Sequence, residues 1–212
     1  MEDRLQVANS SLKNGEWKKG RDIADSVLRE MRDRIASGDA SGDLLAVAYM
    51  FRSIGEAGMG DAESGAWDFG IAQTLYPAYS KVDLQPYGAA GELLTRSRYA
   101  ESAPSDPARR PTQPPAEHGA GDVVPPRKLS GDKPEYPLAK AASCIENTIL
   151  VRTIINQQGR PESPSLPAGT DPVLGVAALD AVRTWRFEPA TQDGKPVRVW
   201  FELSVNFHVR GC

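Results

Sequence analysis

Apolar and polar residues alternate strictly in the last part of the chain. Val197, Val199, Phe201, Leu203, Val205 and Phe207 fall on one side of the alternation, and Arg198, Trp200, Glu202, Ser204, Asn206 and His208 fall on the other. Successive side chains of a strand point to opposite faces, so the pattern predicts a strand from Val197 to Val209. One apolar and one polar face are typical of an antiparallel sheet that a helix covers on one side only.

Another strand is predicted earlier, from Thr148 to Ile155. β-Branched residues predominate there, and the segment runs into a turn that closes at Gly159. Pro161, Pro164 and Pro167 follow the turn. Because proline cannot donate to a ladder of backbone hydrogen bonds, any strand in this stretch must be short or lie at an edge of the sheet.

An amphipathic helix is predicted between these segments and the last strand. Asp171 is a favourable N-cap residue, and Pro172 suits the first helical position. Apolar residues then recur every three or four positions up to Trp185, which we expect in the core. Pro189 is expected to end the helix. The order predicts an α+β module, ββαβ, with a three-stranded antiparallel sheet and one helix.

Residues 1–99 are predicted to be helical. Helical periodicity runs from Trp17 to Ile35, from Leu44 to Ile54, from Ala62 to Leu75 and from Tyr87 to Tyr99, with glycines in the interruptions. Helical hairpins of this kind favour α-solenoid repeats, and an irregular helical bundle is the alternative. Gly15-x-Trp17-x-x-Gly20 and Leu75-Tyr76-Pro77 resemble tetratricopeptide (TPR) or Sel1-like repeats. The resemblance implies an all-α, TPR-like domain that binds a protein partner.

A proline-rich segment separates the two halves. Residues 103–126 are rich in Pro, Ala, Ser and charged residues, and they have almost no apolar periodicity. Such a composition is typical of an extended, semi-rigid spacer. We therefore predict a helical domain at 1–99, a linker at 100–130 and an α+β domain at 131–212.

Composition excludes several classes of function. The chain has 212 residues and a net charge of −3, without the basic stripe that nucleic-acid binding needs. No phosphate loop, nucleophile elbow or metalloprotease motif is present. The two histidines, His118 and His208, have no ligand or triad partner at a recognisable spacing. We expect no catalysis, no metal site and no cofactor.

The carboxyl-terminal part carries a longer pattern. It consists of Tyr136-Pro137, then Ala177-Ala178-x-x-Ala181-Val182-x-x-Trp185-Arg186-Phe187-x-Pro189-Ala190, then Gly194-Lys195-Pro196 before the last strand. This pattern resembles the C-terminal domain of the TonB-family energy transducers, which a proline-rich spacer also precedes. The resemblance implies a periplasmic module that binds an extended peptide, the TonB box of an outer-membrane transporter, alongside its final strand.

The resemblance also implies which residues bind the peptide. They are Pro134, Glu135, Tyr136, Pro137, Val197, Val199, Trp200, Phe201, Leu203 and Val205. Glu135 stands where the family often has a neutral polar residue, which bears on peptide selectivity. Trp200 has polar neighbours in the alternation, so it serves either in cross-strand packing or in contact with a partner.

One property departs from the family. No run of apolar residues approaches the length of a membrane span, and no export signal opens the sequence. A TonB transducer needs an inner-membrane anchor, so we expect either that an anchor has been removed or that a cleaved export signal left a soluble periplasmic protein. The alternative function is envelope scaffolding by self-association, as a homodimer. The protein partner of the helical domain is unknown.

The family's sheet further implies a disulfide. Its first and last strands are antiparallel neighbours, and pairing near Ile155 with Phe201 would bring Cys144 opposite Cys212, give or take two residues. Exactly two cysteines in an exported type of domain favour a bridge. The alternative is a buried, free Cys144 and an exposed Cys212 at the frayed end of the chain.

Overall fold

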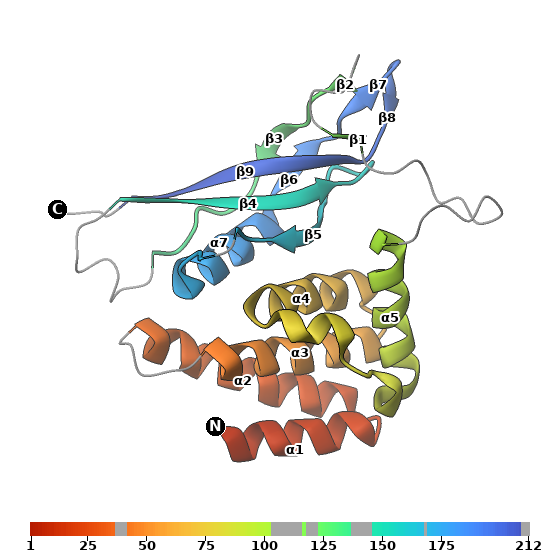
Figure 1. Cartoon of the computed structure of the whole chain (residues 1–212), viewed down its shortest axis with the longest axis vertical. Coiled ribbons are helices and arrows are strands. Elements are labelled where there is room, and N and C mark those ends of the chain that lie inside the picture. Colours follow the sequence, from red (N-terminus) through yellow and green to blue (C-terminus); the bar gives the residue numbers. More distant parts are fainter. Residues whose placement is uncertain (37–41, 103–115, 118–122, 137–145, 168, 209–212) are drawn as a thin grey trace. The chain divides into compact units, whose positions relative to one another are not determined.

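The computed structural model divides the chain into two compact units, Met1–Pro104 and Ser105–Cys212. The structure describes residues 1–36, 42–102, 116–117, 123–136, 146–167 and 169–208. Helices make up the first unit, whereas the second contains sheets and a helix (Figure 1). The predicted order, an all-α half followed by an α+β half, is therefore confirmed.

The first unit is built from helices joined by short turns. They are α1 (Glu2–Lys13), α2 (Trp17–Ala36), α3 (Gly42–Gly58), α4 (Ala62–Leu75) and α5 (Gly88–Ser102), with two 3-10 turns, η1 (Pro77–Lys81) and η2 (Gln85–Tyr87), before α5. Each of the helices α1 to α4 packs against the next. This succession agrees with the predicted helical hairpins, and the assignment to TPR-like repeats stays a prediction.

Glycines allow these helices to approach closely. A Cβ atom on Gly20 of α2 would lie 2.5 Å from Leu12 Cδ2 of α1. A Cβ atom on Gly65 of α4 would lie 2.8 Å from the carbonyl oxygen of Ser53 in α3. Neither distance leaves room for a methyl group, so larger side chains here would push the helices apart.

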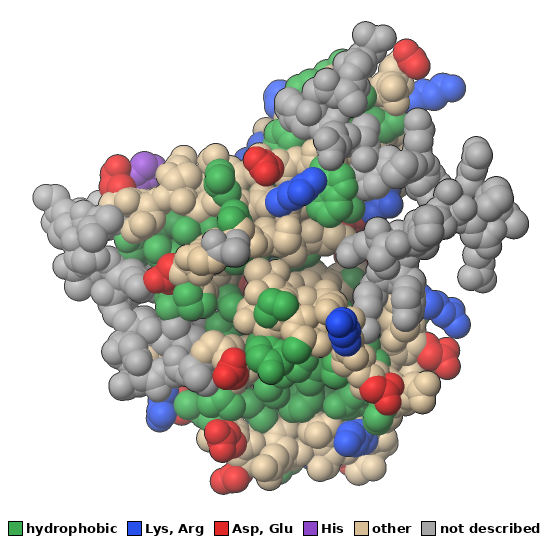
Figure 2. Space-filling model, viewed as in Figure 1, with side chains coloured by type: hydrophobic (Ala, Val, Ile, Leu, Met, Phe, Trp, Pro, Cys, Tyr) green, Lys and Arg blue, Asp and Glu red, His purple; other side chains and the backbone are tan. Residues whose placement is uncertain are grey.

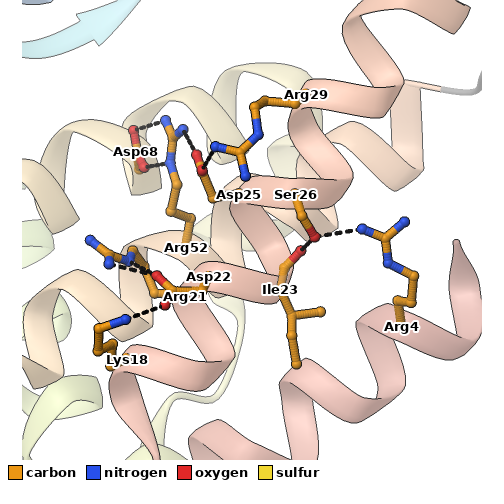
Figure 3. Close-up of polar contacts among 10 residues, drawn as sticks. All are labelled: Arg4, Lys18, Arg21, Asp22, Ile23, Asp25, Ser26, Arg29, Arg52 and Asp68. Atoms are coloured by element: carbon orange, nitrogen blue, oxygen red, sulfur yellow. Dashed lines mark hydrogen bonds and ion pairs between the residues drawn. The ribbon is translucent and has the colours of Figure 1, made fainter.

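A buried ion pair joins the helices of the first unit (Figure 3). Arg52 of α3 donates two hydrogen bonds to the carboxylate of Asp68 in α4, one of them 2.9 Å long, and a third of 3.2 Å to Asp25 of α2. Asp68 is fully buried. Burial alone would lower the pKa of Arg52, but the nearby Asp68 carboxylate raises it well above its ordinary value. Arg52 therefore stays charged inside the unit.

The second unit contains the predicted strand, strand, helix and strand. These are β4 (Asn147–Ile155), β5 (Pro161–Ser165), α7 (Pro172–Thr184) and β9 (Val199–Phe207). β4 is antiparallel to both β5 and β9, and α7 packs on β4 and β5. A fourth strand, β1 (Ala116–Glu117), extends the order to β1-β9-β4-β5 and runs parallel to β9. The three-stranded antiparallel core is confirmed, and the parallel fourth strand was not predicted.

The register between β4 and β9 differs from the predicted one. Ile155 pairs with Val199, two residues from Phe201 and at the limit of the predicted margin. Because side chains alternate with a period of two, a shift of two residues leaves every side chain on the same face, and the apolar pattern could not reveal it. Cys144 and Cys212 lie outside the described residues, so the disulfide stays a prediction.

The helix α7 begins as predicted but ends early. The side chain of Asp171 accepts hydrogen bonds from the backbone N–H groups of Val173 and Leu174, as an N-cap residue does. The helix stops at Thr184 and Trp185 is extended, so the prediction that Pro189 ends it was wrong. The chain instead enters β6 (Arg186–Glu188), whose backbone pairs with β3 (Arg127–Ser130).

Short strands attach the chain before β4 to the module. β3 pairs with β6, and β2 (Val123–Val124) joins β7 (Thr191–Gln192) and β8 (Lys195–Pro196) in a small sheet. The linker that we predicted at 100–130 therefore contains two segments, β2 and β3, that pair with strands of the second unit. An exposed ion pair of 2.9 Å between Arg127 and Glu188 accompanies the β3–β6 pairing.

Candidate functional site

Among the described residues, one side of β9 is paired over only two of its residues. β9 pairs with β4 over nine residue pairs, from Val199 to Phe207, without a bulge. On its other side, the described residues supply only the two-residue strand β1, beside Val199 and Trp200. From Glu202 to Phe207, no strand of the described residues lies on that side. An edge of this kind is a template for a further strand.

Two rows of side chains flank this edge, as the alternation predicted. Leu203, Val205 and Phe207 are buried on the inner face, whereas Glu202, Ser204 and Asn206 are exposed on the outer face. Beneath the inner row, the rings of Phe187 and Phe201 meet at 6.5 Å between centroids. An added strand would therefore meet an apolar row on one face and a polar row on the other.

Tyr136 of the Tyr-Pro motif lies at the far end of β9. The ring of Tyr136 meets the ring of Phe207 edge to face, 5.5 Å between centroids. Its hydroxyl oxygen accepts a hydrogen bond of 3.1 Å from the side-chain amide of Asn147 in β4. Glu135 is exposed and Pro134 half-buried, while Pro137 lies outside the described residues. The structure thus brings Tyr136 to the end of the strand that the resemblance paired it with.

Trp200 lies at the other end of the same edge. It is half-buried on the outer face, and the guanidinium of Arg152 stacks on its ring at 4.9 Å from the centroid. In the register it lies opposite Ile154, which is 2% exposed. These contacts are the cross-strand packing that we considered for Trp200. Its backbone also pairs with Glu117 of β1.

Val197 lies before the strand, not in it. β9 begins at Val199, and the backbone N–H of Val197 donates a hydrogen bond of 2.8 Å to the carbonyl oxygen of Ala190. Arg198 also points back into the module, where it forms a 3.0 Å ion pair with Glu162 of β5. The start of β9 is thus held by its own unit, whereas no described strand lies on the other side of its later part.

Several residues of the site carried no recognisable signal in the sequence. Arg152 and Arg198 read as ordinary polar positions of strands, and their partners became visible only with the register. A strand of two residues, such as β1, is too short for any periodicity. Phe187 and Trp185 were predicted to be buried, and they are 4% and 6% exposed, respectively.

The site has the features of a binding surface. Within the part of the chain that the structure describes, no group of three or more His, Cys, Asp or Glu residues is placed to hold a metal ion. None of the described helices is both long enough and apolar enough to span a membrane. What the edge offers is a row of backbone hydrogen-bonding groups between an apolar and a polar row of side chains.

Comparison with known proteins identifies the class of this module. Residues 132–209 match the family described as the Gram-negative bacterial TonB protein C-terminal domain. The second unit therefore carries a TonB-type C-terminal domain, as the sequence pattern indicated, and that family is one of interaction modules without enzymatic activity. The match begins after the helices, so it does not bear on the TPR-like prediction.

A curated relative agrees with this assignment. The chain is 30% identical over 81 residues to Protein TonB of Vibrio cholerae serotype O1 (strain ATCC 39315 / El Tor Inaba N16961). The alignment covers 37% of this chain and 33% of that protein, so the chain spans about a third of the length of this relative. No solved structure matches the chain significantly.

Proposed function

We propose that the chain is a periplasmic, TonB-like binding protein that captures an extended peptide of an outer-membrane transporter. The peptide adds as a strand to β9. The observation that carries this proposal is the accessible side of β9 from Glu202 to Phe207, in a domain that matches TonB C-termini.

Strand addition suits the chemistry of this edge. Main-chain hydrogen bonds supply affinity without regard to side chains, and alternate side chains supply selectivity. Apolar residues of the peptide would lie beside Leu203 and Val205, and polar residues beside Glu202 and Ser204. Tyr136 would limit how far the peptide extends, because its ring already packs on Phe207 at the end of the strand.

Peptide titration by NMR tests the proposal. A peptide with the TonB-box sequence of a transporter is added to the ¹⁵N-labelled chain, and a scrambled peptide of the same composition is the control. We expect saturable shifts of the backbone amides from Glu202 to Phe207 with the first peptide only. Shifts confined to residues of the helical unit would show that the edge is not the binding site.

The helical unit is proposed to bind a second protein. Apolar side chains reach the surface of this unit (Figure 2). Val7, Met59 and Tyr76 are 50%, 42% and 42% exposed. Photo-cross-linkers placed at these positions in cells are expected to capture one recurrent partner. A cross-linker at Lys18, an exposed cation on α2, is the control. Equal labelling from every position would contradict the proposal.

The same edge favours a second candidate, self-association in an envelope scaffold. Two copies of β9 would then pair edge to edge, since an uncovered strand accepts a strand from any chain. Analytical ultracentrifugation with and without the transporter peptide separates the two functions. A dimer that the peptide dissociates supports capture at a shared edge, whereas a dimer that ignores the peptide favours the scaffold.

The disulfide between Cys144 and Cys212 remains part of the proposal. The chain-entropy relation for a loop of this length gives a stabilisation of about 4 kcal/mol, less if the bridge is strained. Intact mass after alkylation of the non-reduced, periplasm-expressed protein measures it directly. No alkylated thiol is expected, and two alkylated thiols would rule the bridge out.

A further inference from the structure

We infer that the chain carries its own competitor for the peptide-binding edge: β1 is a tethered internal ligand that occupies the start of β9 and lowers the affinity for an incoming peptide. The inference rests on the proposed function for its consequence, and on the observed β1–β9 pairing for its mechanism. Ala116 pairs with Val199 and Glu117 pairs with Trp200, in parallel.

The position of β1 shortens the edge that a partner can use. β9 presents nine residues to β4, and β1 lies on the opposite side of the first two. A peptide that pairs along the whole strand must therefore displace β1. A peptide restricted to the stretch from Glu202 to Phe207 forgoes the hydrogen bonds at Val199 and Trp200.

The short connection between β1 and β2 allows a strand of only two residues to compete with a free peptide. Pairing over two residues is weak by itself, because each backbone hydrogen bond contributes little in water. However, β2 begins at Val123, soon after Glu117, and its pairing with β7 anchors the chain to the module. The hairpin of β7 and β8 leads directly into β9. The short connection keeps β1 near the start of β9 at a high effective concentration, which a free peptide must overcome.

The position of β1 in the chain suggests how its contact with β9 could regulate peptide binding. Among the described residues, β1 is the first segment after the helices of the first unit that pairs with a strand of the second unit. Separation of β1 from β9 would leave β9 open to a partner along its whole length, from Val199 to Phe207, and not only from Glu202 onward. Capture of the peptide and release of β1 are then coupled, and each favours the other.

Proline substitution in β1 tests the inference. The variant Ala116→Pro/Glu117→Pro removes both backbone donors of β1 and disfavours its pairing. The control variant Thr112→Pro/Gln113→Pro adds the same number of prolines to the sequence before β1. We expect the β1 variant to bind the transporter peptide roughly 3- to 10-fold more tightly than the parent, as the competent state becomes fully populated. The control should bind like the parent.

A second measurement keeps this test separate from the proposed function. Without any peptide, the β1 variant should shift the amide resonances of Val199 and Trp200. It should also speed hydrogen exchange at whichever of these two adjacent residues directs its N–H group toward β1, while the control leaves both properties unchanged. Unchanged resonances would overturn the internal pairing, even if the peptide binds. Shifted resonances with an unchanged peptide affinity would overturn the competition. If no variant binds peptide but the resonances shift, the proposed function fails and the internal pairing stands.

Discussion

The two long edges of the main sheet are built in opposite ways. β5 has five residues, contains Pro161 and Pro164, and holds Ser163 at a φ of +53°. Its pairing with β4 also shifts register between Arg152 and Ile154. β9 has nine residues in unbroken register, and it contains no proline. The protein blunts one edge against further pairing and leaves the other edge regular.

The two strands also differ in the side chains that form hydrogen bonds with backbone carbonyl oxygens. Beside β5, side chains of the same unit do so: the hydroxyl of Thr153 donates to the carbonyl oxygen of Glu162, and that of Ser165 donates to Arg152 at 3.3 Å. The later part of β9 has no comparable side-chain contacts to its backbone among the described hydrogen bonds. Among the described residues, the contrast between the two strands supports the proposed strand addition at β9.

The largest expected effect comes from proline in β9. Consecutive residues of an antiparallel strand direct their N–H groups alternately toward the partner strand and away from it. One of the variants Glu202→Pro and Leu203→Pro therefore breaks the pairing with β4, and we expect it to lose about 3 kcal/mol or more of stability. The other should stay folded and lose peptide capture. Hydrogen exchange and peptide titration measure the two outcomes.

Alanine at the same positions provides the matched controls. Glu202→Ala leaves every backbone donor in place, and Leu203→Ala separates the loss of the buried side chain from the effect of proline. If both proline variants remain folded and bind the peptide as the parent does, the two edges do not differ in function and the comparison fails.

The next effect is expected from truncation of Trp185, a buried side chain of the second unit. The indole of Trp185 donates a 2.8 Å hydrogen bond to the carbonyl oxygen of Asp132, and the ammonium of Lys128 lies 3.1 Å from its ring centroid. Trp185→Ala should destabilise the module by about 3–5 kcal/mol, as truncation of a buried aromatic does. Exchange rates of β4 and β9 amides report this loss, whereas the half-buried Trp200→Ala should have a smaller effect. An unchanged exchange rate in Trp185→Ala would show that Trp185 does not stabilise β4 and β9.

A smaller loss of stability is expected when the ion pair between the start of β9 and β5 is removed. Arg198, just before β9, pairs with Glu162 of β5, and the two side chains are 25% and 33% exposed. Arg198→Met should lower the stability by about 0.5–1 kcal/mol at low salt, because a partly exposed ion pair contributes little more. Arg127→Met is the control, since the pair of Arg127 with Glu188 is 72% and 58% exposed. Denaturant midpoints at two salt concentrations provide the measurement, and equal losses in both variants would be evidence against the link.

The smallest effect is expected at the blunted edge. Pro164→Val restores a backbone donor in β5 without changing the rest of the strand. We expect a weak gain of self-association, visible only at high protein concentration by analytical ultracentrifugation, because Ser163 still distorts the strand. A strong new dimer would mean that Pro164 alone blunts this edge. No change at all would assign the whole effect to the distorted backbone.

The two edges also differ in how far they could be predicted. The prolines after Gly159 predicted that any strand there is short or lies at an edge, and the alternation from Val197 onward predicted both faces of β9. The register escaped prediction because a shift of two residues preserves the faces. The end of α7 escaped because Trp185 and Phe187 fit an amphipathic helix as well as an extended segment. The strand β1 depends on a tertiary contact of two residues, which leaves no pattern.

The buried pair of Arg52 and Asp68 sets a lower limit on the smallest fragment that can fold. A fragment that ends before α4 would keep Arg52 and lose the fully buried carboxylate that matches it. The cation would then have to leave the interior or remain there with the longer contact to Asp25 and the ring of Tyr49, and breaking such a buried pair typically costs about 3–5 kcal/mol. Dissection of the helical unit into shorter autonomous pieces should therefore fail at any boundary that separates these two residues.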